Sequence, residues 1–368
     1  MSISPPTPRG LVLAALCLVM SSVQGQTPSL SQVEAQFNFF HNYLDVSYTL
    51  SGDTARVYLQ VSEDGGLTHL VPLDSLTGDT GRVAPGAGRM IRWVAPGALN
   101  LLQTRVRLVA LSEAPVDIAA LVAQVDSQRL RDNLAWLAQP RHALAAPGGL
   151  AAIKDSLEAR YLAAGVQTER QELVLFGGYR LENILGRQPG LLRERETWVV
   201  DGHFDAVAQT PGADDNASAV AALLEIQRVL SAYLSEATIR YIAFDQEEAG
   251  LLGSIHYVGT VGPPPYEEIA GVLNMEMIGY YDASPGSQSL PLGFNLLFPA
   301  AYAAVAADSF RGNFLTVVGN GAAQPLNQAL AQAAATYVPA LRVVGLTVPG
   351  NGSQAPDLRR SDHAPFWD

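Results

Sequence analysis

The sequence predicts a mixed, mostly parallel α/β sheet with helices on both faces, preceded by a small all-β sandwich domain. Three observations support this fold class. The chain has 368 residues, 48% of them hydrophobic, which is enough for a large buried core and more than one domain. Residues 36–111 contain short runs in which apolar and polar residues alternate. From about residue 116, helical patterns alternate with continuous apolar runs.

The first region has the pattern of a β-sandwich. Alternation at period two predicts strands that bury one face, and turn sequences such as Ser51-Gly-Asp53 separate the runs. The clearest runs lie at 44–50, 55–61 and 104–110. Many short strands with closely spaced turns indicate an immunoglobulin- or fibronectin-like sandwich, which we place at 30–113. The sequence does not indicate a partner for this domain.

The second region, 116–368, has the pattern of an α/β domain. Helices are predicted at 122–138 and 150–164, and apolar strands at 197–201, 238–244 and 271–278. Buried parallel strands are nearly continuous apolar runs, because helices cover both faces of the sheet. The alternation of the two patterns therefore favours a helix-covered sheet that is mostly parallel.

The first 25 residues have the pattern of a signal peptide. Arg9 supplies a positive charge, residues 11–19 are apolar, and the small residues Val23 and Gly25 follow. The apolar run is shorter than the about 20 residues that span a bilayer. We therefore expect a secreted or periplasmic bacterial protein with no integral membrane span. The single cysteine, Cys17, lies inside this segment, so we expect neither disulfides nor thiolate metal ligands in the mature chain.

The charge balance limits the class of partner. The net charge is −12 and no cluster of Lys or Arg stands out, whereas a nucleic-acid partner requires a basic surface. We therefore expect no nucleic-acid partner. A bound metal ion would have to be held by His, Asp and Glu.

Acidic residues and one histidine follow three successive predicted strands. His203 and Asp205 end the first strand, and Asp215 follows in the same loop before a predicted helix. The carboxyl ends of strands in open α/β sheets are where ligands bind. These residues are therefore candidate metal ligands.

The next two strands add three glutamates. Glu247 and Glu248 follow the strand at 238–244, so one carboxylate could bind metal while its neighbour accepts a proton. Glu276 interrupts the apolar run at 271–278, and an unpaired buried charge is costly, which implies a metal ion or a strong partner. Together the strand ends predict one metal-dependent site.

The motifs around these residues resemble the zinc aminopeptidases, the family of co-catalytic metallopeptidases that also includes glutamate carboxypeptidases and glutaminyl cyclases. The resemblance runs from about residue 126 to 368. It is carried by Gly202-His-Phe-Asp205, Pro211-Gly-Ala-Asp-Asp-Asn-Ala-Ser218, Glu247-Glu-Ala-Gly-Leu-Leu-Gly-Ser254, Asn274-Met-Glu-Met-Ile-Gly279 and Arg360-Ser-Asp-His-Ala-Pro-Phe366.

The resemblance implies a role for each candidate residue. Asp215 would bridge two zinc ions, with His203 and Glu276 completing the first site. Glu248 would bind the second zinc ion and Glu247 would act as the general base. Asp205 would hold His203 in the correct tautomer. The implied reaction is hydrolysis of peptide or protein substrates by a water activated between the two ions.

Two departures from the family pattern bear on the site. Glu276 stands where the aminopeptidases usually have aspartate, so its longer side chain would shift the metal. The chain ends at Asp368, before the position of the family's last histidine ligand. We therefore expect the peptidase domain to be incomplete at its C-terminus and the second site to lack one ligand, unless His142 or His363 replaces it.

The sequence favours a secreted zinc exopeptidase, most readily an aminopeptidase. A glutaminyl-peptide cyclase on the same fold is an alternative, because that enzyme class works with one zinc ion. A non-catalytic binding protein with a vestigial metal site is another, and cleavage from the carboxyl end is a further option. The sequence indicates neither the side-chain preference nor the oligomeric state.

Overall fold

The computed structural model describes residues 28–38, 40–63, 71–72, 75–97, 100, 103–113, 115–178, 180–261 and 267–368. The expected signal peptide lies outside these residues. The chain divides into two compact units. One contains the described residues up to 117 with 189–196 and 230–238, and the other contains 118–188, 197–229 and 239–368. In the part of the chain that is described, no helix is both long and apolar enough to cross a membrane.

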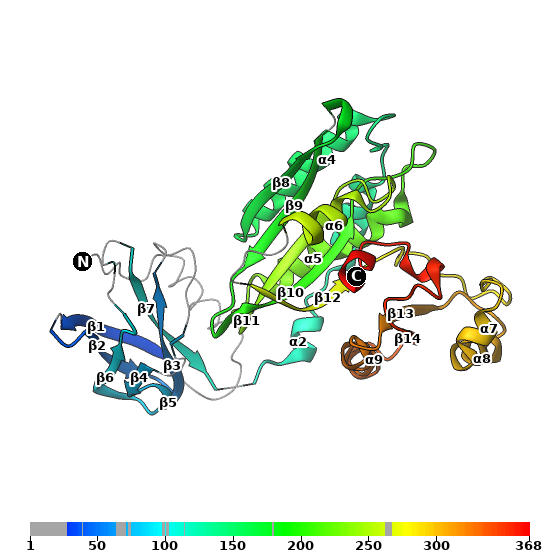
Figure 1. Ribbon diagram of the computed structural model, residues 1–368. Coiled ribbons are helices and arrows are strands. Elements are labelled where there is room, and N and C mark those ends of the chain that lie inside the picture. Colours follow the sequence, from blue (N-terminus) through cyan, green and yellow to red (C-terminus); the bar gives the residue numbers. More distant parts are fainter. Residues whose placement is uncertain are drawn as a thin grey trace. The chain divides into compact units, whose positions relative to one another are not determined.

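The first unit is built from seven strands in two sheets (Figure 1). The strands are β1 (Ser29–Asn38), β2 (Tyr43–Ser51), β3 (Ala55–Ser62), β4 (Leu76–Gly78), β5 (Gly81–Val83), β6 (Gly86–Val94) and β7 (Arg105–Ser112). The sheet orders are β1-β2-β6-β4 and β5-β3-β7, with antiparallel pairings throughout. The alternating runs at 44–50, 55–61 and 104–110 thus lie in β2, β3 and β7.

The alternation in β2 and β3 produces one shared apolar core. Successive side chains of a strand point to opposite faces, so every second residue can be buried. The buried residues of both sheets belong to a single cluster, Leu44, Val46, Tyr48, Leu50, Ala55, Val57, Leu59, Val61, Val83, Ile91, Trp93 and Ala95. Burial of this surface stabilises the pairing of the two sheets.

The second unit surrounds a five-stranded sheet of order β12-β10-β11-β9-β8. Its strands are β8 (Gln167–Val174), β9 (Arg180–Gln188), β10 (Arg193–His203), β11 (Ala237–Phe244) and β12 (Glu268–Asn274). A parallel pair, β13 (Phe314–Asn320) and β14 (Arg342–Val348), lies apart from this sheet in the sequence and in Figure 1. The helices are α2 (Ile118–Val122), α3 (Ser127–Leu137), α4 (Pro147–Ala163), α5 (Ala219–Leu230), α6 (Leu252–His256), α7 (Phe294–Leu297), α8 (Pro299–Ala307) and α9 (Gln324–Tyr337).

The sheet is mixed, and the expectation that it is mostly parallel is not confirmed. β8 and β9 pair antiparallel because a short connection joins them as a hairpin, and β9 also pairs antiparallel with β11. At the other side of the sheet, the carboxyl ends of β10, β11 and β12 meet. The amide of Phe204 donates to Phe244 (2.9 Å), and that of Met275 donates to Asp201 (3.0 Å). This meeting of strand ends positions the site.

Helices α4 and α6 pack on opposite faces of β9. Glu182 of β9 contacts Lys154 of α4 (3.2 Å), while the next residue, Asn183, donates to Gly253 of α6 (2.9 Å). Consecutive residues of a strand face opposite ways, so the two helices cover different faces. Helices therefore cover both faces of the sheet at β9.

Two predicted elements have different bounds in the structure. The helix expected at 122–138 begins only at Ser127, as α3, because Asp126 caps it by accepting from the amides of Gln128 (2.7 Å) and Arg129 (3.3 Å). The strand expected at 271–278 ends at Asn274. Glu276 therefore lies after β12 rather than within it.

Candidate metal centre

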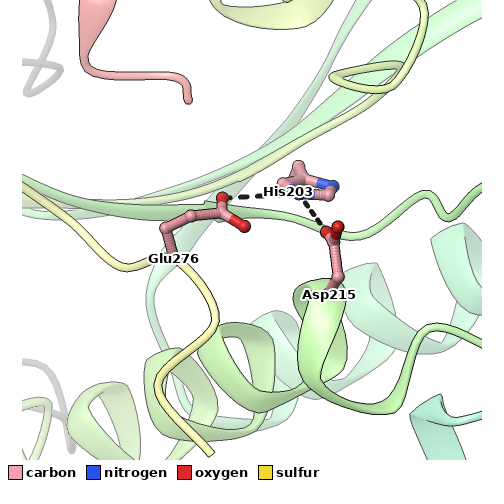
Figure 2. Close-up of side chains that lie close together, drawn as sticks. All are labelled: His203, Asp215 and Glu276. Atoms are coloured by element: carbon pink, nitrogen blue, oxygen red, sulfur yellow. Dashed lines mark ion pairs between the residues drawn. The ribbon is translucent and has the colours of Figure 1, made fainter. Parts of the chain in front are cut away.

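Three residues from different segments place their ligand atoms in one group. His203 ends β10, Asp215 lies in the loop before α5, and Glu276 follows β12. One ligand atom from each lies within 4.8 Å of the other two (Figure 2). In the part of the chain that is described, this is the one group of three or more such residues. It contains three of the four predicted metal ligands.

His203 directs a ring nitrogen at carboxylate oxygens. It is fully buried, and its Nε2 forms no hydrogen bond of normal geometry. Nε2 lies 3.2 Å from Asp215 Oδ1, 3.5 Å from Glu276 Oε2 and 3.8 Å from Glu247 Oε2. Burial lowers the pKa of His203, but the nearby carboxylates of Asp205, Asp215 and Glu276 outweigh this effect and raise the pKa well above its ordinary value. The carboxylates around Nε2 of His203 thus favour a positive charge at this position, which either a proton or a metal cation can supply.

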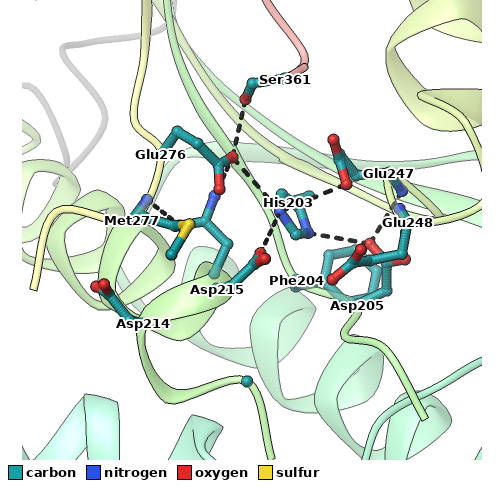
Figure 3. A network of polar contacts seen from close by, with 12 residues as sticks. His203, Phe204, Asp205, Asp214, Asp215, Glu247, Glu248, Glu276, Met277 and Ser361 are labelled. Carbon is teal, nitrogen blue, oxygen red and sulfur yellow. Dashed lines mark hydrogen bonds and ion pairs between the residues drawn. The ribbon is translucent and has the colours of Figure 1, made fainter. Parts of the chain in front are cut away.

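Asp205 connects His203 to the turn that carries the two glutamates. Its Oδ1 accepts from Nδ1 of His203 (3.2 Å), which leaves Nε2 of the neutral ring as the acceptor. The same carboxylate accepts from the amides of Glu247 (3.0 Å) and Glu248 (3.2 Å), as Figure 3 shows. Asp205 therefore orients the ring and the Glu247–Glu248 turn together.

Glu247 faces the group, whereas Glu248 lies beside Asp205 (Figure 3). Burial raises the pKa of Glu247 to about 7, with neighbouring acidic groups adding to the rise. A carboxyl group with such a pKa can accept and release a proton near neutral pH. Burial also raises the pKa of Glu248, and its Oε1 is buried without a hydrogen-bond partner.

The segment after β12 is held by side chains rather than by another strand. The amides of Met277, Ile278 and Gly279 donate to Asn216 (3.3 Å), Ser218 (3.1 Å) and Asp214 (2.7 Å) respectively. All three acceptors belong to the loop that carries Asp215. These bonds explain why the strand ends early and why Glu276 lies next to Asp215.

Sequence reasoning missed Arg141. Its guanidinium is fully buried and donates to the carbonyls of Phe204 (2.6 Å), Pro211 and Gly212 (2.7 Å), and also to those of Leu137 and Gln139. Burial lowers the pKa of Arg141 to about 10, while nearby acidic groups oppose this. Arg141 thus fastens both ends of the loop between His203 and Asp215.

Gly212 supports the same loop through its conformation. Its φ is +57°, and a Cβ there would lie 2.4 Å from the carbonyl oxygen of Asp215. Only glycine fits this close approach without displacing the backbone. The motif that contains Gly212 was recognised in the sequence, but its contact with Arg141 could not be.

The two histidines considered as substitute ligands lie outside the group. His363 has both ring nitrogens near oxygens, Leu358 O (2.9 Å) and Asn274 Oδ1 (3.3 Å), and burial lowers its pKa. The Nδ1 of His142 accepts from the amides of Leu144 and Ala145, as in a turn.

The donor set fits a zinc ion. Zinc is held in proteins by imidazole nitrogen and carboxylate oxygen, and ligating histidines usually donate their other nitrogen to a carboxylate. His203, Asp215 and Glu276 provide the donors, and Asp205 provides that carboxylate. The buried Nε2 without a hydrogen bond is the feature that most directly calls for a cation.

The chain is similar in sequence to several known proteins. The chain is 27% identical over 254 residues to the uncharacterized protein YfbL of Escherichia coli, covering 65% of this chain and 73% of YfbL. It is 36% identical over 117 residues to aminopeptidase YwaD of Bacillus subtilis, covering 30% of this chain and 26% of YwaD. It is 24% identical over 199 residues to a protein of Pyrenophora teres named probable zinc metalloprotease, covering 46% of this chain and 43% of that protein.

Solved structures give weaker likenesses. The LapA aminopeptidase of Legionella pneumophila has a TM-score of 0.48 at 15% identity, covering 85% of both chains. The glutaminyl cyclase of Macrostomum lignano has a TM-score of 0.47 at 17% identity, covering 69% of this chain and 79% of that one.

The family itself is established by the sequence. Residues 183–367, half of the chain, match the peptidase family M28. This range contains all six predicted site residues. The chain therefore belongs to peptidase family M28 and is, by family, a zinc metallopeptidase.

Proposed function

We propose that the chain is a zinc-dependent exopeptidase that removes N-terminal residues from peptides. The observation that carries this proposal is the buried Nε2 of His203, which faces three carboxylates and forms no hydrogen bond. The match to an aminopeptidase covers about a quarter of that relative, so it supports the direction of cleavage without establishing it.

His203, Asp215 and Glu276 would hold the first zinc ion. A bound zinc ion lowers the pKa of a water molecule and polarises the scissile carbonyl group. The protein's own part is to fix the imidazole through Asp205 and to exclude water around it. Glu247, which faces the group with a pKa raised to about 7, would accept a proton and pass it to the leaving amine.

Asp215 and Glu248 would hold a second zinc ion, which would help to polarise the substrate. The buried Oε1 of Glu248, which has no hydrogen-bond partner, supports this role. The group of His203, Asp215 and Glu276 supports one ion, and elemental analysis would count the ions per chain. A single ion would suit a glutaminyl-peptide cyclase, which is the alternative reaction.

We also infer the organisation and location of the chain. Residues 30–113 would form a separate sandwich domain and residues 116–368 the peptidase domain. The shared apolar cluster of the two N-terminal sheets supports the first of these. The pattern of residues 1–25 supports export to the periplasm or the medium.

The test combines metal analysis with matched peptides. The purified chain should contain zinc and release the first residue of a peptide with a free amino terminus, but not of its acetylated counterpart. A chelator should abolish release and added zinc should restore it. Cyclisation of an N-terminal glutamine without release would favour the cyclase, and zinc binding without any turnover would favour a binding protein.

The His203→Ala variant should lose zinc, because it removes the only imidazole of the group. His41→Ala, at an exposed position of the first unit, is the matched control and should retain zinc and activity. Full activity in His203→Ala would contradict the proposed site.

A further inference from the structure

The carboxylate of Glu276, which lies outside the sheet, has polar partners from three segments of the chain. Its Oε2 accepts from Nδ2 of Asn216 (3.0 Å) and lies 2.8 Å from the hydroxyl of Ser361. The same oxygen is 3.5 Å from Nε2 of His203. Figure 3 shows His203 and Ser361 beside the carboxylate of Glu276. The position of Glu276 is thus defined from three different segments of the chain.

The proton of Ser361 has two oxygens within reach. Its Oγ lies 2.8 Å from Glu276 and 2.9 Å from Oδ1 of Asn274. A hydroxyl has one proton, and a carboxylate accepts a stronger and shorter hydrogen bond than an amide oxygen does. The bond from Ser361 to the Glu276 carboxylate is therefore favoured over the bond to Asn274.

The two donors are rigidly placed. Ser361 and Asn216 are almost fully buried. The Nδ2 group of Asn216 also donates to the carbonyl of Met275 (3.0 Å), and its Oδ1 accepts from the amide of Met277. The side chain of Asn216 therefore spans the backbone on both sides of Glu276. Donors held in this way restrict the carboxylate to one orientation.

We propose that Ser361 is a positioning residue for the zinc ligand Glu276, and that together with Asn216 it makes glutamate, rather than aspartate, the suitable residue at this position. The inference rests on the proposed zinc site. An aspartate side chain is one methylene shorter, so its carboxylate would be withdrawn from the hydroxyl of Ser361. The bond would then be lost and the ligand would be free to rotate.

The experiment is a double-mutant cycle read out as zinc affinity. Ser361→Ala, Glu276→Asp and the double variant are titrated with zinc in competition with a fluorescent chelator. Ser361→Ala should weaken zinc binding about 10-fold, which is the low end for loss of a partner that orients a ligand. In the Glu276→Asp background the same change should alter affinity less than about 2-fold, because the bond is already absent.

Two controls separate positioning from a loss of structure. Ser353→Ala removes an exposed hydroxyl from the same C-terminal segment and should leave zinc affinity unchanged. The metal-free Ser361→Ala protein should keep the circular dichroism spectrum of the unmodified chain and unfold in one cooperative transition. With cobalt in place of zinc, its visible absorption spectrum should change, because the geometry of the ligand changes.

Each outcome distinguishes this inference from the proposed function. Wild-type zinc affinity in Ser361→Ala, or an equal loss in both backgrounds, would overturn the positioning role while leaving the zinc site intact. Tight binding by Glu276→Asp would overturn the preference for glutamate. A failure of the unmodified chain to bind zinc would overturn the proposed function and this inference with it.

Discussion

The interiors of the two units differ in chemistry. The first unit packs an apolar cluster to which β2 and β3 each contribute every second residue. Around the candidate site, the second unit instead buries ionisable groups, namely Arg141, Asp201, His203, Asp205 and Asp362. A buried polar group costs about 1–3 kcal/mol unless it is bonded, so its retention needs a compensating contact or a ligand. The second unit has apolar clusters of its own, so the comparison teaches that buried charge is added around the candidate site and does not replace the apolar core.

The largest effect on the chemistry of the second unit should come from replacing the candidate general base, Glu247. Glu247→Gln keeps the size of the side chain but removes its ability to accept a proton. We expect peptide hydrolysis to fall about 10²- to 10⁴-fold with zinc content unchanged. Steady-state kinetics and elemental analysis measure the two quantities. Glu268→Gln, which is exposed at the start of β12, is the control and should keep full activity.

The next largest effect, on the stability of the second unit, should come from replacing the buried cation Arg141. Arg141→Met fills similar space but leaves the carbonyls of Phe204, Pro211 and Gly212 without their donor. We expect the free energy of unfolding of the second unit to fall by about 3–5 kcal/mol, and zinc to bind more weakly. Urea-induced unfolding measures the change. Arg129→Met, whose side chain is largely exposed, should differ by less than about 0.5 kcal/mol; equal losses in both variants would refute the assigned role.

A cavity in the apolar cluster of the first unit tests whether its stability is independent of the candidate site in the second unit. Ile91 is fully buried in β6, so Ile91→Ala should cost about 2–5 kcal/mol of stability in the first unit. Zinc affinity should stay within about 2-fold of the unmodified chain, because the proposed zinc ligands belong to the second unit. A marked loss of zinc binding would show that the two interiors are not independent.

The smallest effect should come from an ion pair of the first unit. Asp45 accepts from Arg92 at 2.6 Å, and this hydrogen bond lowers the pKa of Asp45. The pair therefore contributes stability above the unfolded pKa of 3.8, and this contribution is lost as the pH falls through the lower folded pKa. Asp45→Asn should be slightly less stable than the unmodified chain at pH 7, and the gap should close in strong acid. Urea unfolding at several pH values measures the gap; a constant gap would contradict the assignment.

Much of the site could be predicted because its residues follow strand ends. His203 and Glu247 follow apolar runs, Asp215 lies in the loop after His203, and Glu276 interrupts a third apolar run. The strand ends do meet in the structure. The mixed direction of the sheet was not predictable in the same way. Apolar runs indicate burial, but they do not state in which direction β9 pairs with its neighbours.

The sequence by itself determined which residue types form the group and which family the chain belongs to, since both depend on short motifs of neighbouring residues. Only the tertiary structure decided what holds those residues in place. Arg141 contacts Phe204 across 63 positions, and Asn216 and Ser361 contact Glu276 across 60 and 85. Such contacts form only when the packing of the whole unit brings distant segments together, so no local pattern records them.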